Sequence, residues 1–383
     1  MWLSDGPYLQ TGYSTISRKL LNYLHEYNWK SHYLSHTAQH QPMQPGITLE
    51  DGEKMNFWVH GNGIAPYAQD IIIPKIRELK TPIFGILLDT FMCYPWLLNL
   101  DLSPAKSLFY FPSDGGDFPS GCENVLRKMD KCVAMSLYGQ QQVKKLFNID
   151  AEYIPHAVEP DIYKPLSDEE RLNIKKSMGL AGKFVIGTVA RNQGRKMLDR
   201  MITSFALVAK EMPEAVLLLH TDKQDPAGYF NFDYIINKYG LQNRVFFTGM
   251  RYFKGFNYKD MNNLYNAFDV FFLCTTGEGF GIPTIEAMSA GIPVLVTDYT
   301  TTEELVTRHK SGEAIKVNDE ILGNWHVWRA IMDVKDAAQK LLKLRNNPLL
   351  RKEYGLNGRS AVLKEYNWPV VAKQWDTLLT KML

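Results

Sequence analysis

The chain has 383 residues, a length typical of two domains, and its hydrophobic content of 45% and charged content of 22% are ordinary for a globular protein. Its net charge of +2 gives no electrostatic reason to expect nucleic acid or an acidic partner. The first residues lack the basic and apolar segments of a signal peptide, and no apolar run reaches the roughly 18 residues of a membrane span. Peripheral contact with a membrane stays compatible with this sequence.

Four cysteines, Cys93, Cys122, Cys132 and Cys274, show neither CxxC spacing nor another metal-ligand pattern. We interpret them as free thiols, which persist in a reducing compartment. The sequence therefore predicts a cytoplasmic protein without a structural metal.

In the first half of the chain, short apolar runs alternate with longer amphipathic segments, a pattern typical of βαβ units and parallel sheets. The predicted strands are 2–3, 32–34, 56–60, 83–88, 108–111, 132–135 and 152–154. The predicted helices are 14–27, 68–79 and 138–147.

A boundary between the two halves follows at residues 155–182, where prolines interrupt the periodicity. There Ser167 and Glu170 form a capping box that begins a new helix. The alternation then restarts. The predicted strands are 183–190, 215–220, 244–247, 270–273 and 293–296; the predicted helices are 197–210, 230–238, 260–266 and 283–290, and helices dominate from 327 onward.

We therefore predict an α/β protein with two Rossmann-like domains that face each other across a cleft. The first domain comprises residues 1–165 and the second residues 166–365. The amphipathic segment 366–383 has no place in the second sheet, so we expect it to cross back onto the first domain. A helix lying on a membrane is the alternative for this segment.

The segment TTGEGFGIPTIE, residues 275–286, carries the most chemical information. It follows an apolar strand and opens a helix, whose N-terminus offers free N–H groups and a partial positive charge to phosphate. Gly279 and Gly281 let the backbone approach a ligand closely. Glu278 and Glu286 are acceptors suited to sugar and ribose hydroxyls. Amides for a diphosphate and carboxylates for two sugars together favour a nucleotide-sugar as ligand.

A second group follows the strand 183–190 in the segment ARNQGRKM. Arg191 provides a planar fork for phosphate oxygens, and Lys196 adds a mobile point charge. Arg195 is a weaker candidate. The alternative is that these cations form a solvated surface loop.

Several segments resemble the retaining glycosyltransferases of the GT-B fold, in family 4 (GT4, glycosyltransferase group 1). GEGFGIPTIEAMSAGIPVLV resembles the family signature, in which two glutamates are separated by seven residues. TVARNQGRK resembles the segment with the diphosphate-binding Arg and Lys, YIPHAVEPDIYKPL the inter-domain segment, and SDGPYLQTGYSTISRKL the N-terminal glycine loop. The resemblance is dense from about 150 to 310 and thin in the first half.

The resemblance implies a role for each matched residue. Glu278 would contact the transferred sugar, Glu286 the ribose, and Arg191 and Lys196 the departing diphosphate. The donor-binding set it implies is Gly12, Thr11, Arg191, Lys196, Thr248, Gly279, Phe280, Gly281, Ile282, Thr284 and Glu286. The base would lie near residues 248–252.

The resemblance also implies the reaction, which is transfer of a mannose- or glucose-type hexose from a UDP- or GDP-sugar to a hydroxyl of a glycan, lipid-linked or small-molecule acceptor. The anomeric configuration would be kept, and the leaving phosphate would take the acceptor's proton. No DxD triplet occurs in the chain. We therefore expect no metal and no cofactor, with cations in the metal's place.

The first half departs from the family pattern. His60, Asp114 and, more weakly, Asp89 each follow a predicted strand and are candidates for a catalytic polar residue, although each also fits a structural turn. His156 stands where the family commonly has Asn, and we interpret it as hinge packing. After the strand 293–296, TDYTTTEE lacks the Gly of the family's GxxE turn, so Glu303 or Glu304 would fill that role with altered geometry.

Two other functions stay open at this point. One is a nucleotide-sugar epimerase or a phosphorylase on the same fold, since fold alone does not determine function. The other is a non-catalytic subunit that binds a nucleotide-sugar. Hydrolysis of the donor would distinguish an intact transferase from both.

Overall fold

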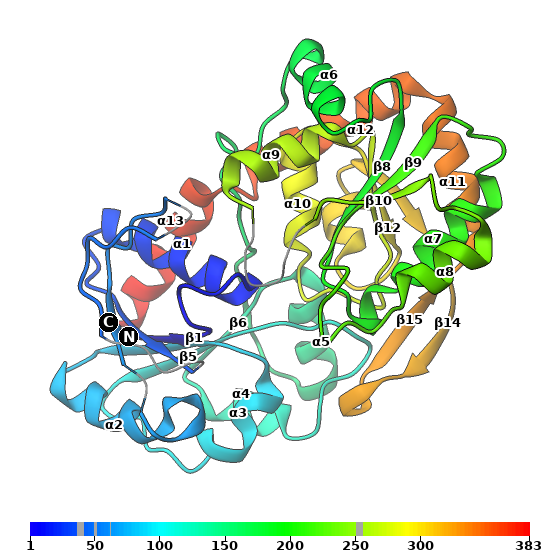
Figure 1. Cartoon of the computed structure of the whole chain (residues 1–383). Helices are drawn as coiled ribbons and strands as arrows, with labels where there is room; N and C mark the ends of the chain where they lie inside the picture. Colours follow the sequence, from blue (N-terminus) through cyan, green and yellow to red (C-terminus); the bar gives the residue numbers. More distant parts are fainter. Residues whose placement is uncertain (37–41, 50–51, 62, 250–255) are drawn as a thin grey trace. The chain divides into compact units, whose positions relative to one another are not determined.

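The computed structural model describes residues 1–36, 42–49, 52–61, 63–249 and 256–383. The chain forms two α/β units (Figure 1). The first comprises Met1–Ala157, Asn324–Val327 and Trp368–Leu383; the second comprises Val158–Gly323 and Trp328–Asn367. The structure thus divides the chain after residue 157, whereas the sequence analysis placed the boundary at 165.

The first unit is built on a parallel sheet with the strand order β3-β2-β1-β4-β5-β6-β7. Its strands are β1 Trp2–Ser4, β2 His32–Ser35, β3 Trp58–His60, β4 Ile83–Leu87, β5 Lys106–Phe111, β6 Lys131–Ala134 and β7 Glu152–Tyr153. All five residues of β4 are buried, as expected for a central strand covered on both faces. The carboxyl ends of all these parallel strands therefore share one edge of the sheet.

Helices lie between most of these strands. They are α1 Gly12–Glu26, η1 Pro66–Ala68, α2 Gln69–Glu78, α3 Thr90–Leu97, α4 Cys122–Lys128 and α5 Leu137–Phe147. Of these, α1, α2 and α5 begin within two residues of the predicted starts. The sequence analysis missed α3 and α4. The α3 sequence, TFMCYPWL, is apolar around nearly the whole helix and contains Pro95, so it shows no helical periodicity.

The C-terminal helix α13, Trp368–Met382, belongs to the first unit and packs beside α1 (Figure 1). Trp375 is 1% exposed and makes edge contacts with Trp2, at 5.7 Å between ring centroids, and with Tyr110, at 4.9 Å. The return of the last helix to the first domain is confirmed. Apolar residues on one face of α13 explain it, because they need a sheet or helix to cover them.

The second unit contains a parallel sheet with the order β10-β9-β8-β11-β12-β13. Its strands are β8 Phe184–Val189, β9 Ala215–His220, β10 Val245–Phe247, β11 Val270–Leu273, β12 Val294–Thr297 and β13 Gly312–Ile315. The predicted bounds of β9 and β11 agree with the structure. Both strands are fully buried, which makes their apolar runs unambiguous.

Among the described residues, seven helices and two short helical turns complete this unit. The helices are α6 Asp168–Ser177, α7 Leu198–Val208, α8 Phe232–Tyr239, α9 Tyr258–Ala267, α10 Ile282–Ser289, α11 Val334–Asn346 and α12 Pro348–Lys364, and the turns are η2 Gly194–Lys196 and η3 Glu303–Thr307. Ser167 and Glu170 form the predicted capping box at the start of α6. The expected α/β class with two parallel sheets is confirmed.

Helices dominate from residue 327 onward, as predicted, but this region opens with a strand that the sequence analysis did not predict. Residues 328–332 are not helical but form the strand β15 Trp328–Met332, paired antiparallel with β14 Val317–Leu322. The short turn η4, Asn324–His326, lies between them and belongs to the first unit, where Trp325 stacks on Phe91. Most of β14 is exposed, so its sequence, VNDEIL, lacks the apolar alternation that identifies a half-buried strand.

Candidate functional site

Two loops meet at the carboxyl edge of the second unit's sheet. The loop after β8 carries Arg195 and Lys196 in the short turn η2, and the loop after β11 leads into α10. The backbone N–H of Thr276 donates a hydrogen bond to the carbonyl of Arg195 at 2.8 Å. Because β8 and β11 are neighbours in the sheet, the fold brings together side chains that are about 80 residues apart in sequence.

A buried ion pair lies at this meeting point. Lys196 Nζ is 2.5 Å from Glu278 Oε1, and Arg195 Nη1 is 3.5 Å from Glu278 Oε2. Burial by itself raises the pKa of Glu278, but the charges of Lys196 and Arg195 outweigh it and hold that pKa at about 2. Glu278 is therefore a carboxylate at neutral pH, and two predicted site residues, Glu278 and Lys196, are in direct contact.

The N-terminus of α10 is open to a ligand. Gly281, its N-cap, has a φ of +101° and supplies no side-chain cap, and Pro283 follows in the first turn. Within the described residues the N–H groups of Gly279, Gly281 and Ile282 make no hydrogen bond. Thr284 is buried, and its N–H donates a hydrogen bond to the carbonyl of Gly281. Free amides and the helix dipole make this turn suited to an anion.

Glu286 lies one turn into α10, in contact with two tyrosines. Tyr265 donates a hydrogen bond from its hydroxyl to Glu286 Oε2 at 2.5 Å, and the hydroxyl of Tyr163 also bonds to this carboxyl group. Burial raises the pKa of Glu286 to about 7, against the lowering effect of the two tyrosines. The sequence analysis missed both tyrosines, because nothing in their local sequence marks them.

The structure places Arg195, rather than Arg191, in contact with Glu278. Arg191 Nε lies 3.0 Å from Asp225 Oδ2, in the segment after β9, rather than beside Glu278. Arg195, the weaker candidate in the sequence, is the arginine that reaches Glu278. Both side chains are more than 30% exposed, so either can reach a bound phosphate.

Thr300 supports the same site from the loop after β12. It has a φ of +50°, a left-handed conformation that glycine adopts more readily, at the point where the family's Gly is absent. Its Oγ1 accepts a hydrogen bond from the N–H of Glu278 at 3.1 Å. Glu304 is buried and Glu303 is exposed on η3. A threonine thus occupies a left-handed position in this turn and adds a contact to Glu278 that glycine lacks.

The expected base-binding segment is only partly described. Thr248 bonds through Oγ1 to His220 Nδ1 at 2.9 Å, at the end of β10. Residues 250–252 of the predicted segment lie outside the described residues.

The carboxyl edge of the first unit's sheet gathers several polar residues. Tyr13 donates to Asp89 Oδ1 at 3.0 Å, and the negative charges of Asp89, Asp114 and Asp5 add to burial in raising its pKa. His36 Nε2 is 2.7 Å from Asp5 Oδ1. Asp89 and Asp114 are therefore near each other, as members of one acidic group. The sequence analysis missed Asp5 and His36, although both follow a strand directly.

His60 lies elsewhere in the first unit. Its Nε2 is 3.0 Å from His32 Nδ1, with the two rings stacked. Burial first, then the nearby charge of Lys75, lowers its pKa. The structure does not bring His60 together with Asp114, because its side chain lies beside the opposite end of β2.

Three further predicted residues lie in the first unit. Thr11 caps α1 by accepting the N–H of Ser14 and donates its own hydroxyl to Asp5; Gly12 is the first, exposed residue of the helix. His156 is 3% exposed and bonds to the Tyr110 hydroxyl through Nδ1 at 2.8 Å, and burial lowers its pKa to about 3. A buried, uncharged His156 agrees with a packing role.

The described residues contain no group of three or more His, Cys, Asp or Glu side chains arranged to hold a metal ion. Among the helices the structure describes, none combines the length and apolar character that a bilayer span requires.

Comparison with known proteins places this site in a family. Residues 170–361 match the family described as Glycosyl transferases group 1. Mannosylfructose-phosphate synthase of Agrobacterium fabrum is 32% identical over 151 residues, which are 38% of this chain and 32% of that protein. The lipopolysaccharide core biosynthesis mannosyltransferase LpsB of Rhizobium meliloti is 28% identical over 218 residues, 56% of this chain and 58% of LpsB. The match thus spans about a third to three fifths of these relatives' lengths.

Solved structures agree in fold over nearly the whole chain. A sucrose-phosphate synthase from Thermosynechococcus elongatus superposes with a TM-score of 0.77 at 16% identity, covering 96% of this chain and 93% of that one. Anabaena HepE in complex with UDP-glucose gives a TM-score of 0.76 at 15% identity, covering 99% and 98%. The fold is that of the GT-B proteins, with two Rossmann-like units, and the chain belongs to the group 1 glycosyl transferases.

Proposed function

We propose that this protein is a retaining glycosyltransferase that moves a mannose- or glucose-type hexose from a nucleotide-diphosphate sugar to a hydroxyl acceptor. The observation that carries this proposal is the buried contact between Lys196 and Glu278 beside the open N-terminus of α10. A cation, a carboxylate and free amides there match the diphosphate and the hydroxyls of such a donor.

In this proposal the donor's diphosphate lies against the first turn of α10 and is neutralised by Lys196, with Arg195 and Arg191 as further cations. The three cations come from one loop, and two of them are exposed enough to move toward a ligand. Glu278 accepts hydrogen bonds from the transferred sugar, and Glu286 accepts those of the ribose.

The transfer itself needs no protein nucleophile. The bond between the sugar's anomeric carbon and the β-phosphate oxygen breaks, and a bond from the acceptor oxygen to the same face of that carbon forms. The acceptor's proton passes to the departing phosphate oxygen. The protein contributes position and stabilises the negative charge that develops on the phosphate, which is the role of Lys196 and the α10 amides.

We further propose that the reaction needs no metal, because Lys196, Arg195 and Arg191 can supply the positive charge that a divalent ion would otherwise bring to the diphosphate. The free, buried thiols of the four cysteines support a reducing compartment, so we place the protein in the cytoplasm. The polar residues around Tyr13 and Asp114 in the first unit are our candidates for holding the acceptor hydroxyl.

The relatives bear on the choice of sugar. LpsB is named as a mannosyltransferase, and a Corynebacterium glutamicum relative, 24% identical over 275 residues, as a GDP-mannose-dependent mannosyltransferase. HepE is solved with UDP-glucose. We therefore propose mannose from a GDP-sugar first and glucose from a UDP-sugar second.

A donor-hydrolysis assay tests the proposal. The protein is incubated with GDP-mannose or UDP-glucose, with and without EDTA, and nucleotide release and the first-formed anomer are followed by proton NMR. We expect slow release of nucleoside diphosphate and a sugar that keeps the donor's α configuration. An epimerised donor, release that requires inorganic phosphate, or binding without turnover would replace this proposal with one of the other functions.

A further inference from the structure

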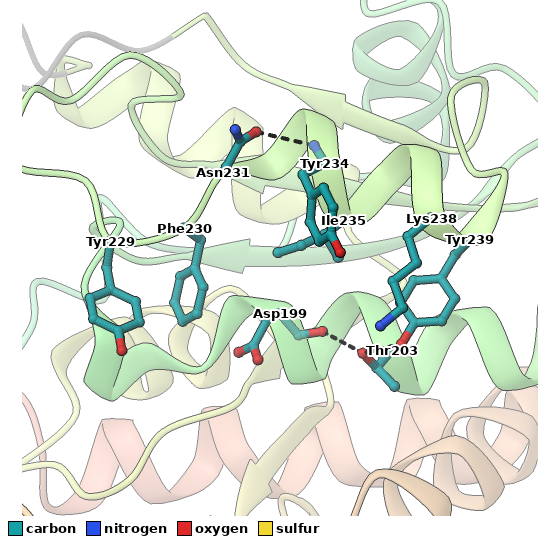
Figure 2. A pocket seen from close by; sticks show the side chains of 9 residues that line it. All are labelled: Asp199, Thr203, Tyr229, Phe230, Asn231, Tyr234, Ile235, Lys238 and Tyr239. Carbon is teal, nitrogen blue, oxygen red and sulfur yellow. Dashed lines mark hydrogen bonds between the residues drawn. The ribbon is translucent and has the colours of Figure 1, made fainter.

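A pocket of about 320 Å³ lies in the second unit between α7 and α8. Figure 2 shows Tyr229 and Phe230 at one end and Tyr239 at the other, with Tyr234 between them. Asp199 enters it from α7 on the facing side. None of the residues assigned to donor binding lines this pocket.

Two of the four described aromatic side chains that line this pocket are unusually exposed. Tyr229 is 73% exposed and Tyr234 is 67% exposed, although tyrosines bury most of their surface in folded proteins. A cluster of exposed rings on a rim marks a binding surface more often than a structural one. The rings offer flat apolar faces, with hydroxyl groups at their tips.

The charges in the pocket balance. The Asp199 carboxylate makes no hydrogen bond or ion pair within the described residues. Lys238 extends along α8 with its Nζ 5.4 Å from the ring centroid of Tyr239. One negative and one positive group leave the pocket without the excess of cations that a phosphate or a nucleic acid requires.

The rim is held rigidly before any ligand arrives. Asn192 receives the N–H of Phe230 on its Oδ1 at 2.9 Å and donates from Nδ2 to the Phe230 carbonyl at 3.1 Å, and its own carbonyl accepts the N–H of Tyr229. A Cβ on Gly194 would lie 3.3 Å from the Tyr229 ring, so this ring rests on the loop that carries Lys196. Preorganisation of this kind lowers the entropy lost on binding.

We propose that this pocket is a second, non-catalytic binding site for a neutral saccharide chain. A pyranose has an apolar C–H face that matches a tyrosine ring and hydroxyl edges that match Asp199, Asn231 and the tyrosine hydroxyls. Neutral charge and pocket size both fit one or two sugar residues. Because Tyr229 rests on the loop that carries Lys196, a glycan bound here is held near that loop, which raises its local concentration at the enzyme.

Affinity electrophoresis tests this proposal. The full-length protein is run through native gels that contain glycogen, dextran or a linear α-1,6-mannan, and the retardation gives a dissociation constant. We expect at least one polysaccharide to retard the wild type, and Tyr234→Ala and Tyr229→Ala to weaken that binding about five- to tenfold through loss of a stacking ring. Tyr234→Phe keeps the ring and should keep most of the binding.

Two controls make the result specific. Tyr27→Ala removes an exposed tyrosine of the first unit and should bind as the wild type does. The double variant Lys196→Met with Glu278→Gln, which leaves no unpaired buried charge, should also be retarded normally, because the pocket is separate from the donor site. Donor hydrolysis by the same preparations then tests the proposed catalytic function independently. Retardation lost in this double variant, or unchanged in Tyr234→Ala, would overturn the pocket as the binding site. Binding of an apolar dye with no retardation by any polysaccharide would show that another class of ligand occupies it.

Discussion

Lys196 and Glu278 have side chains only 9% and 10% exposed, so each depends on the other's charge. Removing one partner of such a pair leaves an uncompensated buried charge, which costs roughly 3–5 kcal/mol. We predict that Lys196→Met lowers the free energy of unfolding by about 3 kcal/mol, whereas Lys196→Met with Glu278→Gln recovers most of the loss. Urea unfolding of the two single variants and the double variant measures this coupling. Additive losses would mean that the two side chains do not depend on each other in solution.

Catalysis should respond differently from stability. We expect both single variants and the double variant to lose transfer by about 10²–10³-fold, because Lys196 stabilises the charge that develops on the phosphate and Glu278 positions the transferred sugar. The double variant is the informative one, since it is stable and yet inactive. Initial rates with saturating donor measure the effect, and a double variant with near-normal rates would remove this pair from the site.

Glu286 predicts a pH dependence. Burial raises its pKa to about 7 from the ordinary value of 4.5. The folded state therefore binds a proton more readily than the unfolded state, and this group's contribution to stability falls as the pH rises from about 4.5 to 7. The affinity for the donor should instead rise with pH, because ribose hydroxyls donate best to the ionised carboxylate.

We accordingly expect the donor to bind up to about tenfold more tightly at pH 8 than at pH 6, and Glu286→Gln to abolish this difference. Isothermal titration with a nucleotide-sugar at both pH values is the measurement. A pH dependence that persists unchanged in Glu286→Gln would have to come from another group.

At position 300 we predict that glycine gives a more stable protein than alanine, the reverse of their usual order. The left-handed conformation of Thr300 costs a non-glycine residue about 1–2 kcal/mol, and its hydroxyl accepts the N–H of Glu278. Thr300→Ala keeps the strain and loses the hydrogen bond, while Thr300→Gly loses the bond but relieves the strain. Thermal unfolding should rank wild type and Thr300→Gly above Thr300→Ala. If Thr300→Ala is more stable than Thr300→Gly, the turn does not have this conformation in solution.

At the scale of elements, α13 stabilises the first unit through Trp375. The ring is 1% exposed and contacts Trp2 and Tyr110 edge-on. We predict that Trp375→Ala destabilises the first unit by about 3–5 kcal/mol. Trp375→Phe should cost clearly less. Hydrogen exchange followed by mass spectrometry should show the loss of protection in β1, β5 and α1, with β8 and β9 protected as before. Equal loss in both units would contradict a role confined to the first.

The strands whose bounds could be predicted to the residue are buried along their whole length. β9 and β11 are buried along their whole length, and their bounds follow from their apolar runs. The hairpin of β14 and β15 could not be predicted, because five of the six residues of β14 are exposed and no alternation distinguishes the strand from a loop. Likewise α3 lacks a polar face, so its sequence resembles a buried strand as much as a helix.

For the whole molecule, the same reasoning explains why the sequence predicts the candidate donor site of the second unit better than the polar group of the first unit. The family match, 170–361, falls almost entirely within the second unit. There, the loop with Lys196 and the motif with Glu278 each directly follow a buried strand, so local patterns reveal them. In the first unit the polar edge is assembled from Asp5, His36 and Asp114, whose separations follow no motif. Their proximity comes only from the order of the strands.

The contacts between site residues could not be predicted from the sequence for a related reason. A motif identifies Arg191 and Lys196 together, but only the fold shows that Lys196 and Arg195 reach Glu278 while Arg191 pairs with Asp225. The tyrosines on Glu286 come from residues 163 and 265, which lie on separate elements.

The central claim is that the second unit binds a nucleotide-sugar through Lys196, Glu278 and the start of α10 without a metal. The most direct measurement is thermal unfolding of the wild type and of the Lys196→Met, Glu278→Gln double variant against UDP-, GDP-, ADP-, CDP- and TDP-sugars, with and without EDTA. A ligand that binds only the folded state must raise the unfolding temperature. The account predicts a rise for the wild type with one nucleotide family, unchanged by EDTA and absent in the double variant. No rise with any donor, or an equal rise in both proteins, would contradict it.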